Sequence, residues 1–412
     1  MNKAFMGPAP EFDKKPKNMS LYKRIYWNRL IFTGVMPLMA LVVGIGWVPL
    51  QLRTAIFTLI YSSISGIGIT AGYHRYWSHR SYSATIGLKI ALAVLGASAG
   101  EGTIRTWCKD HRAHHRYVDT DKDPYAIHKG FLYAHYGWVI IKRRVERNVH
   151  VDIQDLESDP IVLWQRRNYA VILFLSAFVF PILFCGIFFQ DFLGGIIYGS
   201  CMRVFIVQQR TFCINSFAHW FGEKPFSGKN SPCDNFLVAV ITLGEGYHNF
   251  HHEFPVDYRC GYHLLAYDPT KWFIWLCSQL NLAFDLKRFP TNEIKKGHFQ
   301  QIESQLEKKR TGIDWGKPLD ELPVISISKF EEYVRSGQPL ISIDGVAHNV
   351  SDFVDHHPGG PSILRQNFGQ DATRAFRGGL YLHSNAAQNL LSSMRFARVA
   401  NDDESELGQI LG

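Results

Sequence analysis

Long apolar runs alternate with long polar segments over the first two thirds of the chain. Four runs approach the about 20 apolar residues that a membrane-spanning helix needs, namely Ile31–Leu50, Ala55–Tyr73, Tyr169–Phe189 and Phe192–Ala218. Only the short turns Gln51–Arg53 and Gln190–Asp191 separate the first run from the second and the third from the fourth. The pattern predicts four transmembrane helices arranged as two hairpins.

Polar residues interrupt the fourth run at Arg203, Gln208, Gln209 and Arg210. This run is either a buried amphipathic helix or a span whose polar face lines a cavity. A shorter apolar stretch, Ile86–Gly100, is rich in Ala and Gly. Its length favours a helix that lies at the membrane interface or is buried under a cytosolic cap.

Basic segments flank the hairpins on one side, at Lys14–Arg29, at Arg75–Arg167 and after His219. Because positive charge stays on the cytosolic side, we expect both termini in the cytosol. Residues 1–20 are polar and Pro-rich, without the apolar stretch of a cleavable signal peptide, and are predicted to be a disordered head. The seven cysteines include no CxxC pair, so neither a disulfide framework nor a zinc finger is expected.

The pattern changes near Leu322, where short β-branched strands begin to alternate with helical pieces. We therefore predict an all-α membrane core with a helical cytosolic cap (residues 21–290), a linker (291–321), a small α+β domain (322–400) and a tail (401–412). Residues 317–412 carry 12 acidic and 8 basic side chains, although the whole chain has a net charge of +8. Opposite charge on two tethered parts favours their encounter.

Three short histidine-rich motifs carry the candidate chemistry: HRYWSH at 74–79, HRAHH at 111–115 and HNFHH at 248–252. In the second and third motifs the histidines recur at i, i+3 and i+4, so they share one helix face. His74 and His79 are five residues apart, which does not align on a straight helix and predicts a break or turn there. Asn215 and His219 are four residues apart and share a face at the end of the fourth run.

Imidazole is the commonest metal ligand and suits iron, copper and zinc. If the core folds compactly, nine histidines converge, which is too many for one metal ion and favours two. The nine candidate ligands are His74, His79, His111, His114, His115, His219, His248, His251 and His252.

HRYWSH, HRAHH and GEGYHNFHH, in this order around two hairpins, resemble the membrane acyl-CoA desaturases of the stearoyl-CoA (Δ9) type over residues 20–290. The resemblance implies a diiron centre. It assigns one iron to His74, His79, His115 and His252, with a water held by Asn215, and the other iron to His111, His114, His219, His248 and His251. The run EGTIRTW, which ends at Trp107, is more similar to the fungal members than to the animal enzymes.

The resemblance also implies a substrate site. Trp107 and Thr211 match positions at the bend of an acyl tunnel, and Ser62 and Gly66 match its closed end, where their small size predicts tolerance of long chains. Five further residues match positions near CoA: Asn28, Lys109, Asp110, Lys142 and Arg143. Basic residues beside a membrane also attract anionic lipid, which stays an equal alternative for Lys142 and Arg143.

His357-Pro-Gly-Gly, then DATRAF, then His383, resembles cytochrome b5 over residues 322–400. Two histidines on facing helices can ligate the iron of haem b axially, so that the haem passes electrons and does not bind oxygen. Gly359 and Gly360 let the backbone pass close to the porphyrin. Tethering raises the local concentration of this electron donor to roughly millimolar.

The resemblance thus implies a Δ9 desaturase of the endoplasmic reticulum membrane that inserts a cis double bond into stearoyl- or palmitoyl-CoA with O2. We expect no nucleic-acid partner. No dinucleotide-binding glycine fingerprint is present, so NADH would act through a separate cytochrome b5 reductase. Two alternatives stay open: a membrane diiron fatty acid hydroxylase, and a membrane-anchored haem electron carrier whose histidines bind storage metal.

Overall fold

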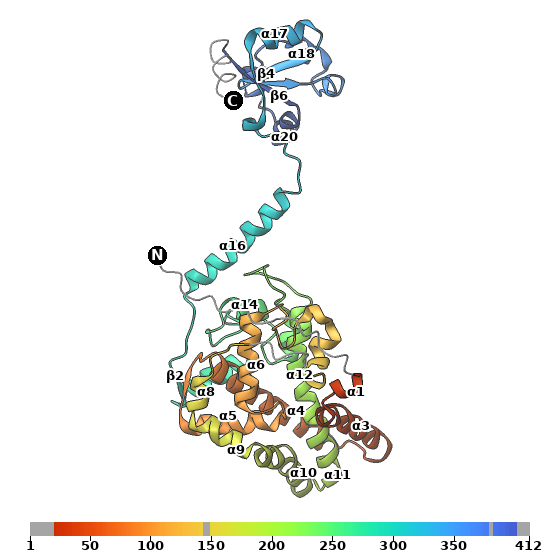
Figure 1. The fold of residues 1–412 in the computed structure, drawn as a ribbon, viewed down its shortest axis with the longest axis vertical. Coiled ribbons are helices and arrows are strands. Elements are labelled where there is room, and N and C mark those ends of the chain that lie inside the picture. The colour runs from red at the N-terminus through yellow and green to blue at the C-terminus, as the bar shows by residue number, and fades with distance from the viewer. Residues whose placement is uncertain (1–19, 143–148, 379–381, 402–412) are drawn as a thin grey trace, which may run out of the picture. The chain divides into compact units, whose positions relative to one another are not determined.

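The computed structural model describes residues 20–142, 149–378 and 382–401 and contains two compact units, Met1–Glu303 and Ser304–Gly412 (Figure 1). The division falls inside helix α16 (Thr291–Arg310), within the predicted linker. The exact domain boundaries stay a prediction. Most of the predicted head and tail lies outside the described residues.

The first unit is almost entirely helical. Besides α16 its α-helices are α1 (Leu21–Arg24), α2 (Trp27–Leu30), α3 (Met36–Trp47), α4 (Leu52–Ile67), α5 (Ile86–Ser98), α6 (Ile104–Tyr117), α7 (Trp138–Ile140), α8 (Gln154–Ser158), α9 (Pro160–Phe174), α10 (Phe180–Phe189), α11 (Phe192–Gly194), α12 (Arg203–Ser216), α13 (Phe236–Ile241), α14 (His248–Glu253) and α15 (Pro269–Gln279). The 3₁₀ and π segments are η1 (Ile31–Val35), η2 (Gly68–Ser78), η3 (Ile127–Lys129), η4 (Tyr133–Gly137), η5 (Leu175–Val179), η6 (Gly195–Met202) and η7 (Phe217–His219). Strands β1 (Ser83–Ala84) and β2 (Ala283–Phe284) form one short antiparallel pair.

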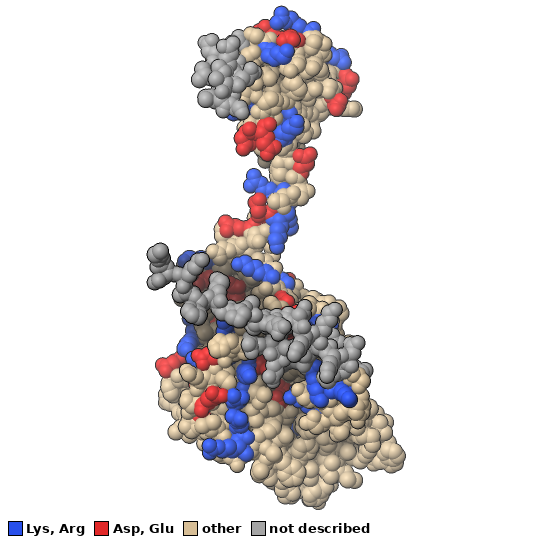
Figure 2. Space-filling model, viewed as in Figure 1, with Lys and Arg blue, Asp and Glu red and all other residues tan. Residues whose placement is uncertain are grey.

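Within the described part of the chain, three helices are long and apolar enough to cross a membrane: Trp27–Trp47, Leu52–Ser78 and Pro160–Phe189. Each is a continuous helix that contains a π-helical segment. Their outward side chains are apolar, as Leu38, Ile45 and Phe188 illustrate. In Figure 2 the end of this unit that holds α3, α10 and α11 shows no charged side chain on the visible face. The unit is therefore a membrane protein by length, composition and surface.

The fourth predicted span is helical over Phe192–His219 (α11, η6, α12 and η7), but it is not among these three helices, so the count of four is not confirmed. Its polar side chains point into the unit. Arg203 is buried and donates to Ser65 Oγ (2.8 Å) and to the carbonyl of Ser98 (2.9 Å). Gln208 donates to the carbonyl of Gly100 (3.3 Å). The polar face therefore packs against α4 and the end of α5.

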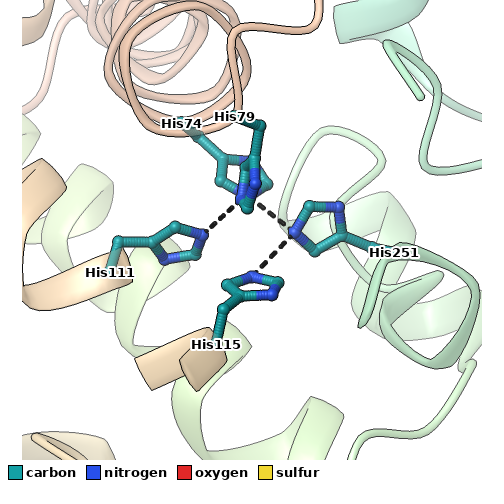
Figure 3. Close-up of side chains that lie close together, drawn as sticks. All are labelled: His74, His79, His111, His115 and His251. Carbon is teal, nitrogen blue, oxygen red and sulfur yellow. Dashed lines mark hydrogen bonds between the residues drawn. The ribbon is translucent and has the colours of Figure 1, made fainter. Parts of the chain in front are cut away.

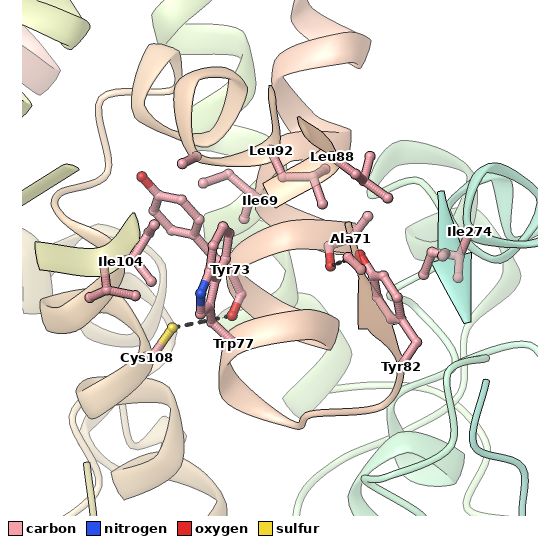
Figure 4. Packing of buried hydrophobic residues seen from close by; sticks show 14 of the residues in the cluster. Ile69, Ala71, Tyr73, Trp77, Tyr82, Leu88, Leu92, Ile104, Cys108 and Ile274 are labelled. Carbon is pink, nitrogen blue, oxygen red and sulfur yellow. Dashed lines mark hydrogen bonds between the residues drawn. The ribbon is translucent and has the colours of Figure 1, made fainter. Parts of the chain in front are cut away.

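Helix α5 lies at the centre of the largest apolar core, packed against α4, η2 and α9 (Figure 4). Leu92 is fully buried in this core together with Ile69 and Tyr73 of η2. The helix begins at Thr85, whose hydroxyl accepts a hydrogen bond from the backbone N–H of Leu88. Its 13 residues are too few to span a bilayer, as the sequence predicts, and its place is in the interior of the helical unit.

The second unit is a small α+β fold, as predicted. Its four-stranded sheet has the order β3-β6-β5-β4, with β3 parallel to β6 and the other pairs antiparallel. The strands are β3 (Val324–Ser326), β4 (Leu340–Ile343), β5 (Val346–Asn349) and β6 (Arg395–Ala400); the helical segments are η8 (Leu319–Glu321), α17 (Ile327–Arg335), η9 (Val354–His356), α18 (Pro361–Gln366), α19 (Thr373–Phe376) and α20 (Asn385–Ser393). Two apolar clusters fill the unit, one around Ile341 and Val354 and the other around Phe330 and Leu340.

Candidate metal centre and substrate cavity

The π-helical segment η2 explains the five-residue spacing of the first motif. A π turn bonds residue i+5 to residue i, and the backbone N–H of His79 donates to the carbonyl of His74 over 3.1 Å. The two imidazole rings consequently lie together, with centroids 4.8 Å apart. Where the sequence predicted a break or turn, the structure has a widened helix.

The other two motifs lie on short helices, as their spacing predicts. Helix α6 begins at Thr103, whose hydroxyl accepts from the N–H of Thr106, and it presents the histidines of HRAHH. Helix α14 presents those of HNFHH. His219 lies in η7, directly after α12. Elements far apart in the sequence thus bring all nine histidines into one buried region.

The ring nitrogens form two sets, and in each set they lie within 4.8 Å of one another. The first set, shown in Figure 3, consists of His74, His79, His111, His115 and His251. The second set consists of His114, His219, His248 and His252. The partition expected from the resemblance is therefore wrong for three residues: His111 and His251 belong with the first set, and His252 belongs with the second. The reason is that successive motif histidines along α6, and likewise along α14, point alternately toward one set and the other.

These histidines fit a bound cation. Nε2 of His251 lies 3.0 Å from Nε2 of His74 and 3.1 Å from Nε2 of His115, although a single proton can serve only one of these contacts. Burial, reinforced by neighbouring histidines, holds the pKa of most of them well below the usual range: His79, His111, His115, His219, His248, His251 and His252. Neutral imidazoles with converging lone pairs are the donor set that a transition metal needs.

A cavity of about 420 Å³, within the range usual for small-molecule sites, adjoins the first histidine set. Its wall includes His74 and His111 together with five residues that the sequence predicted for the site: Asn28, Trp107, Asp110, Thr211 and Asn215. The indole of Trp107 stacks on the ring of His111, with centroids 5.0 Å apart and an interplanar angle of 22°. The cavity thus brings predicted substrate residues next to predicted metal ligands.

Other predicted substrate residues do not line this cavity in the described part of the chain. Ser62 accepts a hydrogen bond from Arg210 (3.3 Å), and a Cβ at Gly66 would contact Leu243. The ammonium of Lys142 lies 5.5 Å from the ring centroid of Tyr26, and Lys109 also lies away from the cavity wall. Arg143 falls outside the described residues.

Glu101 is a cavity residue that the sequence reasoning missed. Its carboxylate accepts hydrogen bonds from Thr211 Oγ1 (2.7 Å) and Trp107 Nε1 (3.1 Å). Burial raises the pKa of this carboxyl to about 7. An acidic residue directly before a predicted wall segment, in the run EGTIRTW, was the available signal.

In the second unit, the two predicted haem ligands His357 and His383 each bond to a backbone carbonyl through Nδ1. His357 Nδ1 donates to the carbonyl of Gly360 (3.2 Å), and His383 Nδ1 donates to that of Phe376 (3.0 Å). Because the proton is on Nδ1 in both rings, the lone pair is on Nε2. A Cβ at Gly359 would come within 2.9 Å of the His357 ring, so a larger residue there would push this ring out of its place. These features fit haem.

Fold and sites together define a membrane protein with a candidate metal centre and a second, small α+β domain. Residues 46–270 match the family described as fatty acid desaturase, and residues 326–400 match the cytochrome b5-like haem/steroid binding domain. The chain belongs to the fatty acid desaturase family and is therefore a lipid-metabolising oxidoreductase of the membrane. The second domain indicates haem, and the family implies iron.

Named relatives extend over most of the chain. A probable acyl-CoA desaturase of Schizosaccharomyces pombe is 47% identical over 386 residues, covering 94% of this chain and 80% of that protein. Acyl-CoA desaturase 1 of Saccharomyces cerevisiae is 43% identical over 387 residues, covering 94% and 76%. Stearoyl-CoA desaturase 5 of Homo sapiens is 37% identical over 289 residues, covering 68% and 86%. The similarity to the fungal proteins includes the second unit, as the resemblance to fungal members predicted.

Proposed function

We propose that this protein is a Δ9 acyl-CoA desaturase that forms a cis double bond in saturated long-chain acyl-CoA such as stearoyl- or palmitoyl-CoA. The observation that carries the proposal is the cavity that adjoins converging, neutral imidazoles. The names of the relatives, which specify acyl-CoA and stearoyl-CoA, support the substrate class.

Each histidine set would hold one iron ion, and Asn215 would hold a water at this centre. The iron pair would supply the redox chemistry, namely the reduction of O2 and the removal of two hydrogens from adjacent methylenes of the acyl chain. The balance is one saturated acyl chain, O2, two electrons and two protons giving one unsaturated chain and two waters. The protein contributes nitrogen ligands, a buried site and a defined substrate position.

Polar residues of the cavity wall, among them Asn28, Arg29 and Asp110, would hold the CoA end. The rest of the wall includes apolar side chains such as Ile69 and Leu173, which suit an alkyl chain and exclude water. Lys109 and Lys142, which do not line the cavity, would bind the CoA phosphates together with Arg143. Ser62 and Gly66 would mark the closed end, which is supported by their burial on one face of α4. With Ser62→Tyr we expect a shift in preference toward shorter chains.

Electrons would reach the irons from haem b held between His357 and His383. A separate NADH-cytochrome b5 reductase would reduce this haem. The tether between the units supports electron transfer from the haem to the irons, because it keeps donor and acceptor at high effective concentration.

The proposed location is the endoplasmic reticulum membrane, with both termini in the cytosol. Phe192–His219 would be the fourth span. Because Arg203 and Gln208 bond within the helical unit, this helix can lie in a bilayer without exposing them to lipid. The histidine motifs would then lie on the cytosolic side.

The test is expression in a host that lacks its own desaturase, followed by determination of double-bond positions in its lipids. We expect 9-unsaturated C16 and C18 chains. Hydroxylated chains would support a hydroxylase in place of a desaturase, and unchanged lipids from a protein loaded with haem and iron would refute the proposal.

A further inference from the structure

One histidine in each set bonds to a buried carboxylate through the ring nitrogen that faces away from the set. His74 Nδ1 lies 2.9 Å from Glu245 Oε2, and His114 Nδ1 lies 2.9 Å from Asp123 Oδ1. By contrast, Nδ1 of His248 and Nδ1 of His251 have no hydrogen-bond partner among the described residues. The two carboxylate contacts thus occur once per set and come from different parts of the chain.

Glu245 is held in place by groups that do not depend on the histidine. It is 1% exposed, and its Oε1 accepts from Nη2 (2.8 Å) and Nε (3.1 Å) of Arg75. The same guanidinium bonds to both oxygens of buried Asp268, at 2.9 and 3.0 Å. The orientation of Glu245 is therefore fixed by a buried ionic framework that links η2 to the start of α15.

Asp123 is held in place by the backbone. It is 2% exposed, and it accepts hydrogen bonds from the N–H groups of Tyr125 (3.1 Å) and Asp119 (3.2 Å). The oxygen that accepts from Tyr125, Oδ1, is also the atom that lies 2.9 Å from His114 Nδ1. Asp123 is therefore oriented by two backbone hydrogen bonds, where Glu245 is oriented by Arg75.

A carboxylate accepts hydrogen bonds and cannot donate them, so each contact puts the imidazole proton on Nδ1. The lone pair of the same ring is then on Nε2, which points into the set, and the nearby negative charge strengthens it as a donor. We propose that Glu245 and Asp123 are positioning residues, one for each metal site, that hold His74 and His114 in the tautomer and orientation in which Nε2 binds metal. The inference rests on the proposed two-metal function.

The experiment uses the purified full chain with its haem, and it compares Glu245→Gln and Asp123→Asn with wild type. An amide can donate to Nδ1, which moves the imidazole proton to Nε2 and removes that ligand. Asp257→Asn is the matched control, because Asp257 is an equally buried carboxylate paired with Arg259 (2.7 Å) and contacts none of the nine histidines. The readouts are iron per haem by elemental analysis and the rate of iron release to a chelator.

We expect two irons per haem in wild type and in Asp257→Asn. In each test variant one iron of the two should be released faster, with about 10–100-fold weaker binding, while the other is retained. Glu245→Asp and Asp123→Glu, which keep the carboxylate but displace it, should give intermediate release at the same single site and cover the case in which an amide variant does not fold. Wild-type release in all four variants, or equal iron loss in Asp257→Asn, would overturn the inference. Wild type without iron would instead refute the proposed function.

Discussion

The indole N–H of Trp107 donates a hydrogen bond of 3.1 Å to the carboxylate of Glu101. The same indole stacks on His111, so one ring connects a buried acid to a metal-ligand candidate. Thr211 bonds to the other carboxylate oxygen over 2.7 Å. Glu101 thus fixes two residues of the cavity wall at once, and its protonation state affects the stability of this wall.

The contribution of Glu101 to the free energy of unfolding should fall as pH rises through the range in which this carboxyl ionises. Burial raises the pKa of Glu101 from 4.5 to about 7, so the folded protein holds this proton more tightly than the unfolded chain does. The contribution is fully present below pH 4.5 and is lost as pH rises toward 7, by up to about 3 kcal/mol. The seven buried histidines with a lowered pKa act in the opposite direction, because their contribution is lost as pH falls. The decline should therefore appear as the difference in unfolding temperature between wild type and Glu101→Gln, measured from pH 4.5 to 8.

Glu101→Gln should abolish this component, since an amide does not titrate. Glu157→Gln is the control, because Glu157 is exposed and forms only a surface pair with Arg105. The control should retain the wild-type pH profile. A profile for Glu101→Gln that runs parallel to wild type at every pH would show that Glu101 makes no such contribution.

Loss of a histidine from the first set should abolish desaturation while leaving the haem unit intact. His251 lies within 3.1 Å of both His74 and His115 through Nε2, so His251→Ala removes the nitrogen that is central to the set. Activity should fall by more than the about 10–100-fold that loss of an outer partner costs. Product formation and the haem absorption band are measured on the same sample. His298→Ala, an exposed histidine outside both sets, should leave both unchanged.

Loss of a haem ligand should remove the haem and leave the metal ligands of the first unit in place. In His357→Ala the axial lone pair is missing, so the haem band should disappear and NADH-driven desaturation with it. The histidine sets of the first unit are untouched, so iron content should remain at the wild-type value. Addition of a separate reduced cytochrome b5 should restore part of the activity. Full activity without haem or added donor would contradict the proposed electron path.

Spacing alone predicted much of this architecture. Apolar run length located three membrane helices, and the i, i+3, i+4 recurrence placed the histidines of α6 and α14 on helix faces. Spacing could not assign each histidine to a set. His114 and His115 are neighbours in sequence and differ only in the direction that α6 gives their side chains. That direction depends on tertiary packing. The π-helical segment η2 was likewise hidden, since a five-residue spacing is compatible with a break, a turn or a widened helix.

The missed polar residues had weak signals of a different kind. Glu245 stands within the motif GEGYHNFHH, but a charged residue near a metal motif is equally compatible with a solvated surface. Only its burial beside Arg75, together with the 2.9 Å contact to His74, separates the two interpretations. The sequence likewise does not show that Arg203, within the fourth predicted span, is buried and bonds to Ser65 of α4 and to Ser98 at the end of α5.

The close crossing of η2 and α5 should be intolerant of a single added methyl group. A Cβ at Gly68 would collide with the backbone at Leu95 and Gly96, which cannot move away as a flexible side chain can. Gly68→Ala should therefore destabilise the first unit by about 1–3 kcal/mol, seen as a lower unfolding temperature of the detergent-solubilised protein. Gly87→Ala is the matched control on α5, because nothing lies within 4 Å of its added Cβ. There the helix preference of alanine should leave stability unchanged or raise it by up to about 1 kcal/mol. Equal unfolding temperatures for the two variants would mean that the crossing is not tightly packed.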